Sequence, residues 1–400
     1  MINVINGYVP TFLLVCTLLP LVKDPMGDVS SSSNYRAIAI GSLLLKCFDW
    51  VLLLLEGDKL STDQLQFGFQ AMASTSMCTW TLNTVVEHFN MKGRTVYGAA
   101  MDCSKAFDMC SWVSPFNDLI EKGVAAIFLR VLMFIYKNQA CDIQWNGKFS
   151  QRFPVTNGVR QGAIISPLFF SVYVDKLIDK CLRYLGIGCK VNGQFYGILV
   201  YADDIFLLCP SRDGLQTMIS ECERFASKKN LKFSVNPDPK KSKTKCIIFS
   251  KKTVNRDLIA PIMLYGVPLP FVPSLLHLGN TLEEDNSMSL DTNIKRCKFI
   301  GKMNSLSQEF FFTTPDVRTK LFFIYTTSFY GSNLYDLYNR NTEKLFTTWN
   351  KTFRLNYDLP YLTHRYLIEP VTNNYHLKTL LCSRFMKFSD TLNNCKEPSV

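Results

Sequence analysis

Three aspartates are the residues whose types and positions most clearly suggest chemistry. Asp102 ends the apolar run TVYGAAMD, and Asp203 and Asp204 lie between the apolar runs ILV and IFLLC. Carboxylates at the ends of buried strands repel one another unless a cation or a base neutralises them. Hard oxygen ligands suit Mg²⁺, and two such ions can assist an in-line phosphoryl displacement. A structural role as capping or solvated carboxylates is the alternative, and residue types alone leave both open.

The segments around these aspartates must form the elements that position them. Apolar periodicity predicts a strand over 95–102, a hairpin whose turn carries the Asp203-Asp204 pair, and a strand over 246–250. The dipeptides Asn146-Gly147 and Asn192-Gly193 predict tight hairpin turns. Helices are predicted over residues 43–57 (buried), 111–123, 125–138, 166–185 and 214–230, and again beyond about Asp291.

Composition limits the classes of protein to consider. The chain has 400 residues, 47% of them hydrophobic, which suits two or three coupled lobes with a large core. Its formal net charge of +11 favours a polyanionic partner, either nucleic acid or an anionic membrane surface. The fourteen cysteines and four histidines form no C-x-x-C pair or zinc spacing, so we expect reduced thiols.

One apolar segment, Thr11 to Val22, could be mistaken for a membrane or secretion signal. Pro20 interrupts it, it is shorter than the roughly 20 residues of a membrane helix, and no Lys or Arg precedes it. We therefore expect no membrane association and no secretion, and an intracellular location in the nucleus, the cytoplasm or both.

Six segments in order resemble the motifs of reverse transcriptases. Tyr201-Ala202-Asp203-Asp204 resembles the Y-x-D-D signature of that family. The other segments are NYRAIAIGSLLLK (fingers), MDCSKAFD (motif A), GVRQGAIISPLFF (motif B), LKFSVNPDPKKSKTKCIIF (motif D) and LHLGNTL (motif E). Because NYR, QFGF and VRQG occur together, the resemblance is to the non-LTR (LINE-type) retrotransposon members.

The resemblance implies roles for the residues nearest the chemistry. Asp102, Asp203 and Asp204 would be catalytic and bind two Mg²⁺ ions, with Mn²⁺ as the alternative metal. Lys243, or else Lys245, would donate a proton to the leaving pyrophosphate. Phe107 would act as the steric gate that rejects a 2′-hydroxyl.

The same resemblance implies contacts with substrates. Arg36 would contact the triphosphate, with Lys46 as a second candidate, and Gln161 and Gly162 would lie against the template and the nucleotide. Glycine suits such a position because it lets a base pair approach the backbone. Leu278 and Gly279 would belong to the primer grip.

The fold implied is α/β (α+β): a right-hand polymerase with fingers and a split β-α-β-β-α-β palm, followed by a helical thumb-like lobe. The expected divisions are residues 1–93 for an N-terminal extension and fingers, 94–285 for the palm with inserted fingers elements, and 286–400 for the thumb-like region. The reverse transcriptase domain as a whole would cover about 18–282.

The function implied is RNA-directed DNA polymerase, a nucleotidyltransferase that extends a primer 3′-OH with dNTPs by two-metal phosphoryl transfer. Its partners would be an RNA template, a DNA primer and dNTPs. Two departures, Ala37 where Pro is expected and Gln70 where many relatives carry Arg, motivate an alternative: a catalytically inactive, nucleic-acid-binding remnant. No endonuclease domain is recognisable, so cleavage of target DNA is not assigned.

Overall fold

The computed structural model describes residues 7–70, 72–103, 109–110, 112–159 and 162–395. Its contacts divide the chain into two compact units that interleave in sequence. Unit 1 comprises Met1–Ala73, Ala99–Thr244 and Pro261–Pro270, and unit 2 comprises Ser74–Gly98, Lys245–Ala260 and Phe271–Val400. The domain boundaries expected at residues 93 and 285 remain predictions.

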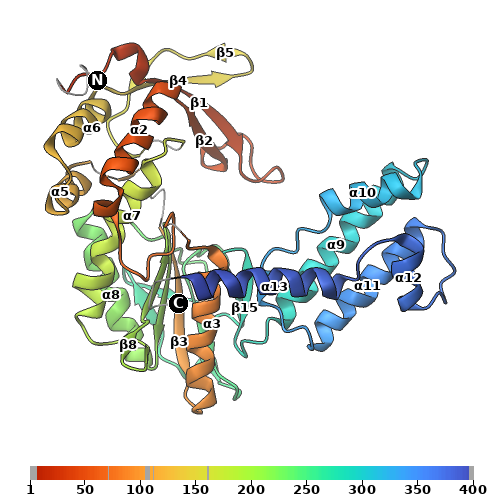
Figure 1. Ribbon diagram of the computed structural model, residues 1–400. Coiled ribbons are helices and arrows are strands. Elements are labelled where there is room, and N and C mark those ends of the chain that lie inside the picture. Colours follow the sequence, from red (N-terminus) through yellow and green to blue (C-terminus); the bar gives the residue numbers. More distant parts are fainter. Residues whose placement is uncertain (1–6, 71, 104–108, 111, 160–161, 396–400) are drawn as a thin grey trace. The chain divides into compact units, whose positions relative to one another are not determined.

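The first sheet of unit 1 has the order β2-β1-β4-β5, with β6 also paired to β4. Its strands are β1 (Val15–Val22), β2 (Tyr35–Ile40), β4 (Ala140–Trp145), β5 (Lys148–Phe149) and β6 (Phe153–Pro154) (Figure 1). Strand β1 is antiparallel to β2 and parallel to β4. Most of the apolar segment from Thr11 to Val22 is therefore a paired strand, after a single 3₁₀ turn, η1 (Thr11–Leu14). Within the described part of the chain, no helix combines the length and apolar character that crossing a membrane requires.

Both predicted Asn-Gly turns are confirmed. Asn146-Gly147 joins β4 to β5 with φ of 48° and 77°, and Asn192-Gly193 joins β7 (Lys190–Val191) to β8 (Gln194–Phe195) with φ of 50° and 84°. Two successive positive φ values define a type I′ turn, whose twist matches that of the flanking strands. Asn and Gly adopt this conformation at lower cost than other residues.

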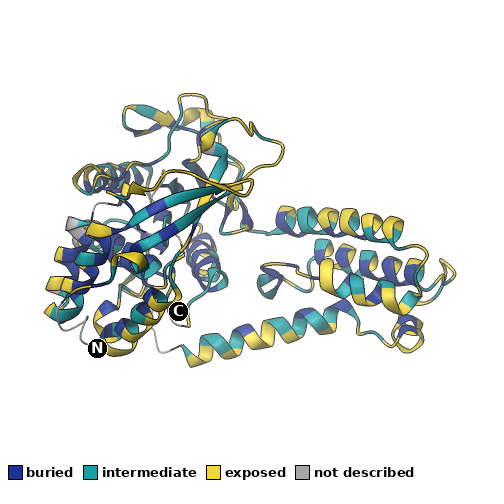
Figure 2. Ribbon diagram, turned by 90° about the horizontal axis from the view of Figure 1, so that it is seen from above, coloured by how far each residue is buried: buried dark blue, intermediate teal, exposed yellow. Residues whose placement is uncertain are grey.

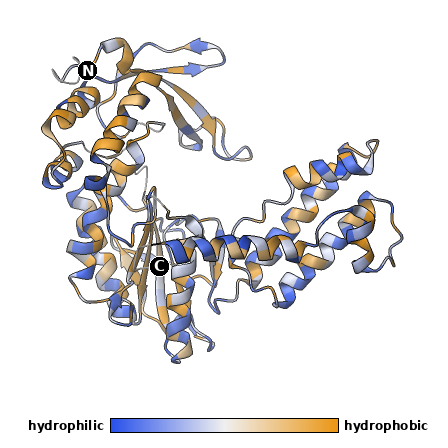
Figure 3. Cartoon of the chain, viewed as in Figure 1, coloured by the Kyte–Doolittle hydropathy of each residue, from blue (hydrophilic) through white to orange (hydrophobic). Residues whose placement is uncertain are grey.

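Helix α2 (Leu43–Glu56) confirms the predicted helix but not its predicted burial. Leu45 packs in a buried cluster with Leu14 of η1 and with Val131 and Ile135 of α6 (Ala126–Asn138). The opposite face is exposed to solvent at Leu43, Leu44, Trp50, Val51, Leu54 and Leu55, with exposed fractions of 44–74%. Figure 3 shows most of α2 in the colour of hydrophobic residues. A helix that packs on one core can bury only one stripe, so an apolar run does not by itself predict full burial.

A second sheet has the order β11-β3-β10-β9. Its strands are β3 (Val96–Asp102), β9 (Ile198–Tyr201), β10 (Asp204–Cys209) and β11 (Lys245–Phe249). They are largely buried apolar runs, which explains why the sequence predicted them without polar alternation.

The longer helices that remain in unit 1 follow the predicted positions. They are α5 (Val113–Glu121), α7 (Ser166–Lys176) with its π-helical continuation η4 (Leu177–Arg183), and α8 (Arg212–Lys228). Two short 3₁₀ turns, η2 (Ser32–Asn34) and η3 (Gly57–Leu60), were not predicted. Helix α8 contacts both β10 and the hairpin of β12 (Ile262–Leu264) and β13 (Val267–Leu269). Helices and sheets therefore alternate through the chain, which confirms the α/β class.

Unit 2 is mainly helical and is built around aromatic residues. Besides β11, its elements are α3 (Thr75–Met91), η5 (Arg256–Leu258), β14 (Ser274–His277), β15 (Asn280–Glu283), α9 (Ser289–Glu309), α10 (Pro315–Tyr325), η6 (Ser332–Leu334), α11 (Arg340–Asn356), α12 (Arg365–Thr372) and α13 (Leu377–Asn394). Trp349 of α11 stacks on Phe299 of α9 and meets Phe322 of α10 edge-on at a centroid distance of 4.9 Å. Figure 2 shows these helices with buried and exposed stripes. The expected helical lobe beyond Asp291 is thus present.

Candidate functional site

The acidic pair lies where two strands of the second sheet meet. Tyr201 of β9 pairs with Asp204 of β10, so Ala202 and Asp203 form a two-residue hairpin turn. Ala202 has a φ of +58° and Asp203 does not have a positive φ, a pattern that matches a type II′ turn. Asp203 and Asp204 are half-buried at the mouth of this hairpin.

Asp102 is the last residue of β3, the strand next to β10. Its Oδ2 lies 3.6 Å from Nζ of Lys243, whose side chain is 69% exposed. Its backbone N–H donates a long hydrogen bond of 3.4 Å to Oγ1 of the buried Thr244. An ion pair this exposed contributes little to stability, so the contact matters mainly for where it places a cation.

Burial and neighbouring carboxylates raise the pKa values of Asp203 and Asp204. Burial raises the pKa of Asp204 to about 6, and the charges of Asp203 and Asp102 add to that effect. Burial also raises the pKa of Asp203, with a further increase from Asp102, whereas the cations Arg36 and Lys243 oppose it. The structure therefore gathers the predicted acidic residues and two predicted basic residues within electrostatic range.

The donor set fits a hard divalent cation in its chemistry. Oδ2 of Asp102 is buried and accepts no hydrogen bond from the described residues. Burial and repulsion penalise the charged forms of Asp203 and Asp204, and a cation would relieve both effects. The side chains as placed do not yet form a closed cage, because no group of three His, Cys, Asp or Glu residues among those described is positioned to hold an ion.

Arg36 lies on β2, and Gly162 lies in a loop that packs against the same strand. Arg36 is exposed on that strand. Gly162 has a φ of +125°, and a Cβ there would lie 2.5 Å from the carbonyl oxygen of Ala39, three residues beyond Arg36. Glycine is therefore required by the contact with β2 itself, whatever else approaches it. Two other predicted residues, Phe107 and Gln161, lie outside the described residues.

Asp49 supports the loop of Gly162 and was missed by the sequence analysis. It lies on the buried side of α2, and its Oδ2 accepts a hydrogen bond of 3.2 Å from the N–H of Ile164. The available signal was its position, since an acidic residue in the middle of an apolar helix needs a partner when it is buried.

Gln66 is a second residue that the sequence analysis did not single out. Its side-chain oxygen accepts a hydrogen bond of 3.1 Å from the N–H of Ala202, in the acidic turn. The sequence QFGF was noted only as part of a resemblance. The two residues are 136 positions apart, so no local pattern indicated their contact.

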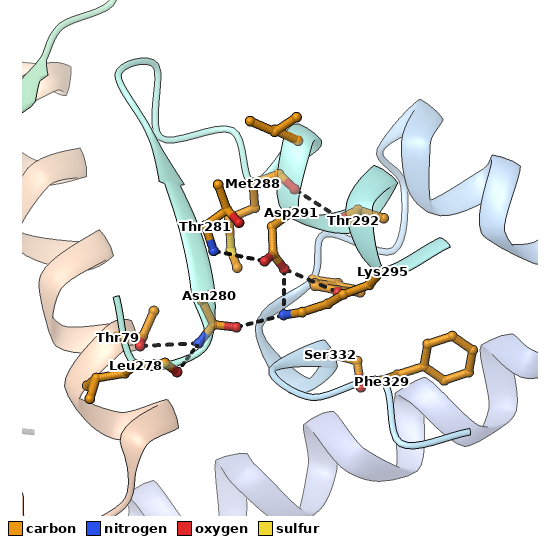
Figure 4. Close-up of polar contacts among 12 residues, drawn as sticks. Thr79, Leu278, Asn280, Thr281, Met288, Asp291, Thr292, Lys295, Phe329 and Ser332 are labelled. Atoms are coloured by element: carbon orange, nitrogen blue, oxygen red, sulfur yellow. Dashed lines mark hydrogen bonds and ion pairs between the residues drawn. The ribbon is translucent and has the colours of Figure 1, made fainter. Parts of the chain in front are cut away.

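Leu278 and Gly279 form the turn between β14 and β15 in unit 2. Both have positive φ, 46° and 75°, and the ring of Tyr330 lies against Gly279. Figure 4 shows a polar network directly after this turn, among Asn280, Asp291 and Lys295.

The core of this network is a buried ion pair. Nζ of Lys295 lies 2.7 Å from Oδ2 of Asp291 and donates a hydrogen bond of 2.9 Å to Oδ1 of Asn280. Oδ1 of Asp291 accepts the N–H of Thr281 at 2.8 Å, and Tyr335 donates to its other oxygen at 3.3 Å. The turn is therefore anchored to α9 through charged groups removed from solvent.

The acidic hairpin and its basic neighbours are carried by an α/β fold of the right-hand polymerase type. The family model described as reverse transcriptase (RNA-dependent DNA polymerase) matches residues 23–260, more than half of the chain. The chain belongs to this family. The predicted relationship to the reverse transcriptases of non-LTR retrotransposons is confirmed.

Three curated relatives show how much of a longer protein this chain resembles. The Pol polyprotein of element R2DM from Drosophila melanogaster is 28% identical over 205 residues, 51% of this chain and 19% of the relative. The Pol polyprotein of element R2 from Nasonia vitripennis is 27% identical over 247 residues, which are 62% of this chain and 23% of the relative. The probable RNA-directed DNA polymerase from transposon BS of Drosophila melanogaster is 24% identical over 294 residues, which are 69% of this chain and 30% of the relative. The chain thus spans less than a third of these relatives.

Solved structures of telomerase are more distant. Apo telomerase from Candida tropicalis aligns with a TM-score of 0.49 and 11% identity, covering 90% of this chain and 59% of that one. Telomerase from Candida albicans in complex with a fragment of telomeric RNA aligns with a TM-score of 0.46 and 12% identity, covering 92% and 66%.

Proposed function

We propose that this chain is an RNA-directed DNA polymerase that extends a primer 3′-OH with dNTPs on an RNA template. One observation carries the proposal: in a member of the reverse transcriptase family, the Asp203-Asp204 turn lies on the strand next to the one that ends at Asp102. Asp203 and Asp204, whose pKa values are raised by burial at the turn, are suited to binding metal rather than to packing.

Members of the family generally use divalent metal ions. Asp102, Asp203 and Asp204 would hold them here, with two Mg²⁺ ions as our proposal and Mn²⁺ as the alternative. When bound, such ions favour deprotonation of the attacking hydroxyl and stabilise the leaving oxygen.

The chain's own residues would handle the substrates. Lys243 is exposed and lies 3.6 Å from Asp102, a position suited to protonating the leaving pyrophosphate. Arg36 is exposed and acts electrostatically on Asp203, and a guanidinium binds phosphate oxygens in a bidentate manner. Phe107 as the steric gate and Gln161 beside the template remain proposals on the motif alone.

The parts assigned to nucleic acid are also proposals. Gly162 would face the template and the nucleotide, and Leu278 and Gly279 would grip the primer. Residues 1–93 would form the N-terminal extension and fingers, 94–285 the palm, and 286–400 the thumb-like region. The formal net charge of +11 supports a polyanionic partner.

The test is primer extension by the purified chain with Mg²⁺, a primed RNA template and dNTPs. We expect incorporation, and we expect Asp203→Ala to reduce it by at least about a thousandfold, since a metal ligand supplies several kcal/mol of transition-state stabilisation. Asp213→Ala is the matched control, because this carboxylate is 92% exposed at the start of α8.

Two results would contradict the proposal in different ways. Extension that survives Asp203→Ala would remove the site assignment. Salt-dependent RNA binding by the unaltered chain without any incorporation would instead support the catalytically inactive remnant.

A further inference from the structure

The segment before the exposed Phe69 lies along the edge of the sheet that carries the acidic turn, whose strand order is β11-β3-β10-β9. β9 is the last strand in the order of that sheet. The N–H of Phe67 donates to the carbonyl of Val200 at 2.7 Å, and the N–H of Val200 donates to the carbonyl of Leu65 at 2.8 Å. Gln66 therefore pairs in parallel with Val200, two residues before the acidic turn.

The side chain of Gln66 reaches the turn itself. Its Oε1 accepts the N–H of Ala202 at 3.1 Å and the N–H of Gly68 at 2.9 Å. An amide oxygen has two lone pairs, so a single atom satisfies both donors. Gln66 and Ala202 are only 2% and 3% exposed, so water cannot readily replace this acceptor.

Ala202 needs such support because of its backbone conformation. A φ of +58° is unfavourable for a residue with a Cβ, and the first position of a type II′ turn is normally glycine. Strained conformations of this kind persist when surrounding contacts fix them, and they cluster at functional sites.

Gly68 brings the supporting segment close enough to the turn. A Cβ at Gly68 would lie 2.4 Å from the backbone nitrogen of Ala202. A side chain there would push the segment away from the turn and lengthen the hydrogen bond from Ala202 to Gln66. The Gln-Phe-Gly sequence therefore supplies an acceptor and a close approach together.

The charge of the supporting group also matters at this position. A glutamate in place of Gln66 would add a buried negative charge next to the acidic turn, and a lysine would add a positive charge and offer no acceptor to the N–H of Ala202. The neutral amide accepts the turn's hydrogen bond without either effect.

We propose that Gln66 is a positioning residue, whose side-chain oxygen holds Ala202 in the left-handed conformation that presents Asp203 and Asp204. The inference rests on the proposed polymerase function for its kinetic consequence. Its structural part, the protection of one backbone N–H, can be measured without activity.

The kinetic test combines two substitutions. Gln66→Met keeps the length of the side chain and removes the acceptor, and we expect kcat to fall about tenfold with KM for dNTP unchanged. Ala202→Gly should restore most of this loss in the double variant, because glycine adopts the positive φ without strain. Gln151→Met, at an exposed glutamine in unit 1, controls for the substitution itself.

The structural test is amide hydrogen exchange at Ala202. We expect exchange at least about tenfold faster in Gln66→Met and unchanged in Gln151→Met, since an amide that loses its acceptor opens more readily. Gln66→Glu retains an acceptor oxygen and should retain the protection, which keeps the test available if the methionine variant folds poorly.

The outcomes separate the two proposals. Absence of incorporation by the unaltered chain, with exchange at Ala202 still dependent on Gln66, would refute the polymerase function and leave the positioning contact established. Unchanged exchange in Gln66→Met, or a double variant no better than Gln66→Met alone, would overturn the positioning role.

Discussion

Two hairpin turns of this chain are held in place by different kinds of group. The Ala202-Asp203 turn in unit 1 carries carboxylates and is supported by the neutral amide of Gln66. The Leu278-Gly279 turn in unit 2 carries no charge, and the residue that follows it is held by the ion pair of Asp291 and Lys295. A charged support is compatible with a turn that has no ionisable group, whereas beside metal-binding carboxylates it would change their charge state.

The largest expected effect is at the acidic turn, where one substitution should lower catalysis and raise stability. Asp204→Asn should lower primer extension at least about a thousandfold, because it removes a proposed metal ligand. It should also raise the free energy of unfolding of the metal-free protein by about 1 kcal/mol, after allowance for partial exposure, since burial and two neighbouring carboxylates penalise its charge. Denaturant unfolding and primer extension on the same preparation measure both.

The opposite stability change would contradict this view of the turn. A less stable Asp204→Asn would mean that the carboxylate makes a favourable contact in the metal-free protein. Asp213→Asn, at an exposed carboxylate, should alter neither quantity appreciably.

The charged support of the second turn predicts a different outcome. Lys295→Met should lower the free energy of unfolding of the chain, measured by denaturant unfolding, by about 3–5 kcal/mol, because it leaves the buried Asp291 charge without its partner. Lys298→Met, at an exposed position on the same helix, should change it by no more than about 0.5 kcal/mol.

A second substitution tests whether the ion pair itself is needed. Asp291→Leu combined with Lys295→Met removes both charges and should recover much of the lost stability. A double variant as unstable as Lys295→Met would show that the hydrogen bonds to Thr281 and Asn280, rather than the unpaired charge, dominate.

The strand that leads into the second turn predicts a pH dependence. His277 is 5% exposed, and burial lowers its pKa to about 4. Below the unfolded-state pKa of about 6.5, the unfolded chain gains a proton that the folded chain does not. Stability should therefore fall by about 2 kcal/mol between pH 7.5 and pH 5, and further toward pH 4.

Substitutions can assign that slope to a residue. His277→Leu should remove this part of the pH dependence, whereas His364→Leu, at an exposed histidine, should leave it unchanged. Denaturant unfolding at the two pH values gives the difference. If the pH dependence of stability persists in His277→Leu, another titratable group causes it.

The smallest expected effect is a difference of about 1 kcal/mol between substitutions of two glycines, one of them in the second turn. Gly279 and Gly266 have nearly the same φ, 75° and 74°, but a Cβ at Gly279 would lie 2.8 Å from the ring of Tyr330 and a Cβ at Gly266 would meet nothing within 4 Å. Gly266→Ala should cost about 1 kcal/mol from backbone strain, and Gly279→Ala about 2 kcal/mol because the ring must also move. Equal costs would show that the ring yields freely.

Sequence reasoning succeeded where the signal was local. Asp102 was expected at the end of a strand and Asp203 in a hairpin turn, and both predictions rest on apolar runs a few residues long. The Asn-Gly turns followed from the backbone preferences of the two residues alone.

Sequence reasoning was incomplete where contacts between distant segments determine the structure. No periodicity connects Gln66 with Ala202, because the hydrogen bond depends on the QFGF segment adding to the edge of β9. Asp291 and Lys295 have the i,i+4 spacing of an ordinary surface pair, and only tertiary packing makes it a buried one. The same limit explains α2, where packing partners rather than composition determined which face is buried.

The outward face of α2 lowers the solubility of the protein. Leu54 and Leu55 are 69% and 63% exposed, so they contribute apolar area to the surface and little to the core. Apolar area of this kind promotes precipitation at high concentration. Replacing both with Lys and Glu should raise the solubility limit and leave the free energy of unfolding within about 0.5 kcal/mol. The helix that supplies Asp49 to the Gly162 loop therefore also limits the solubility of the protein.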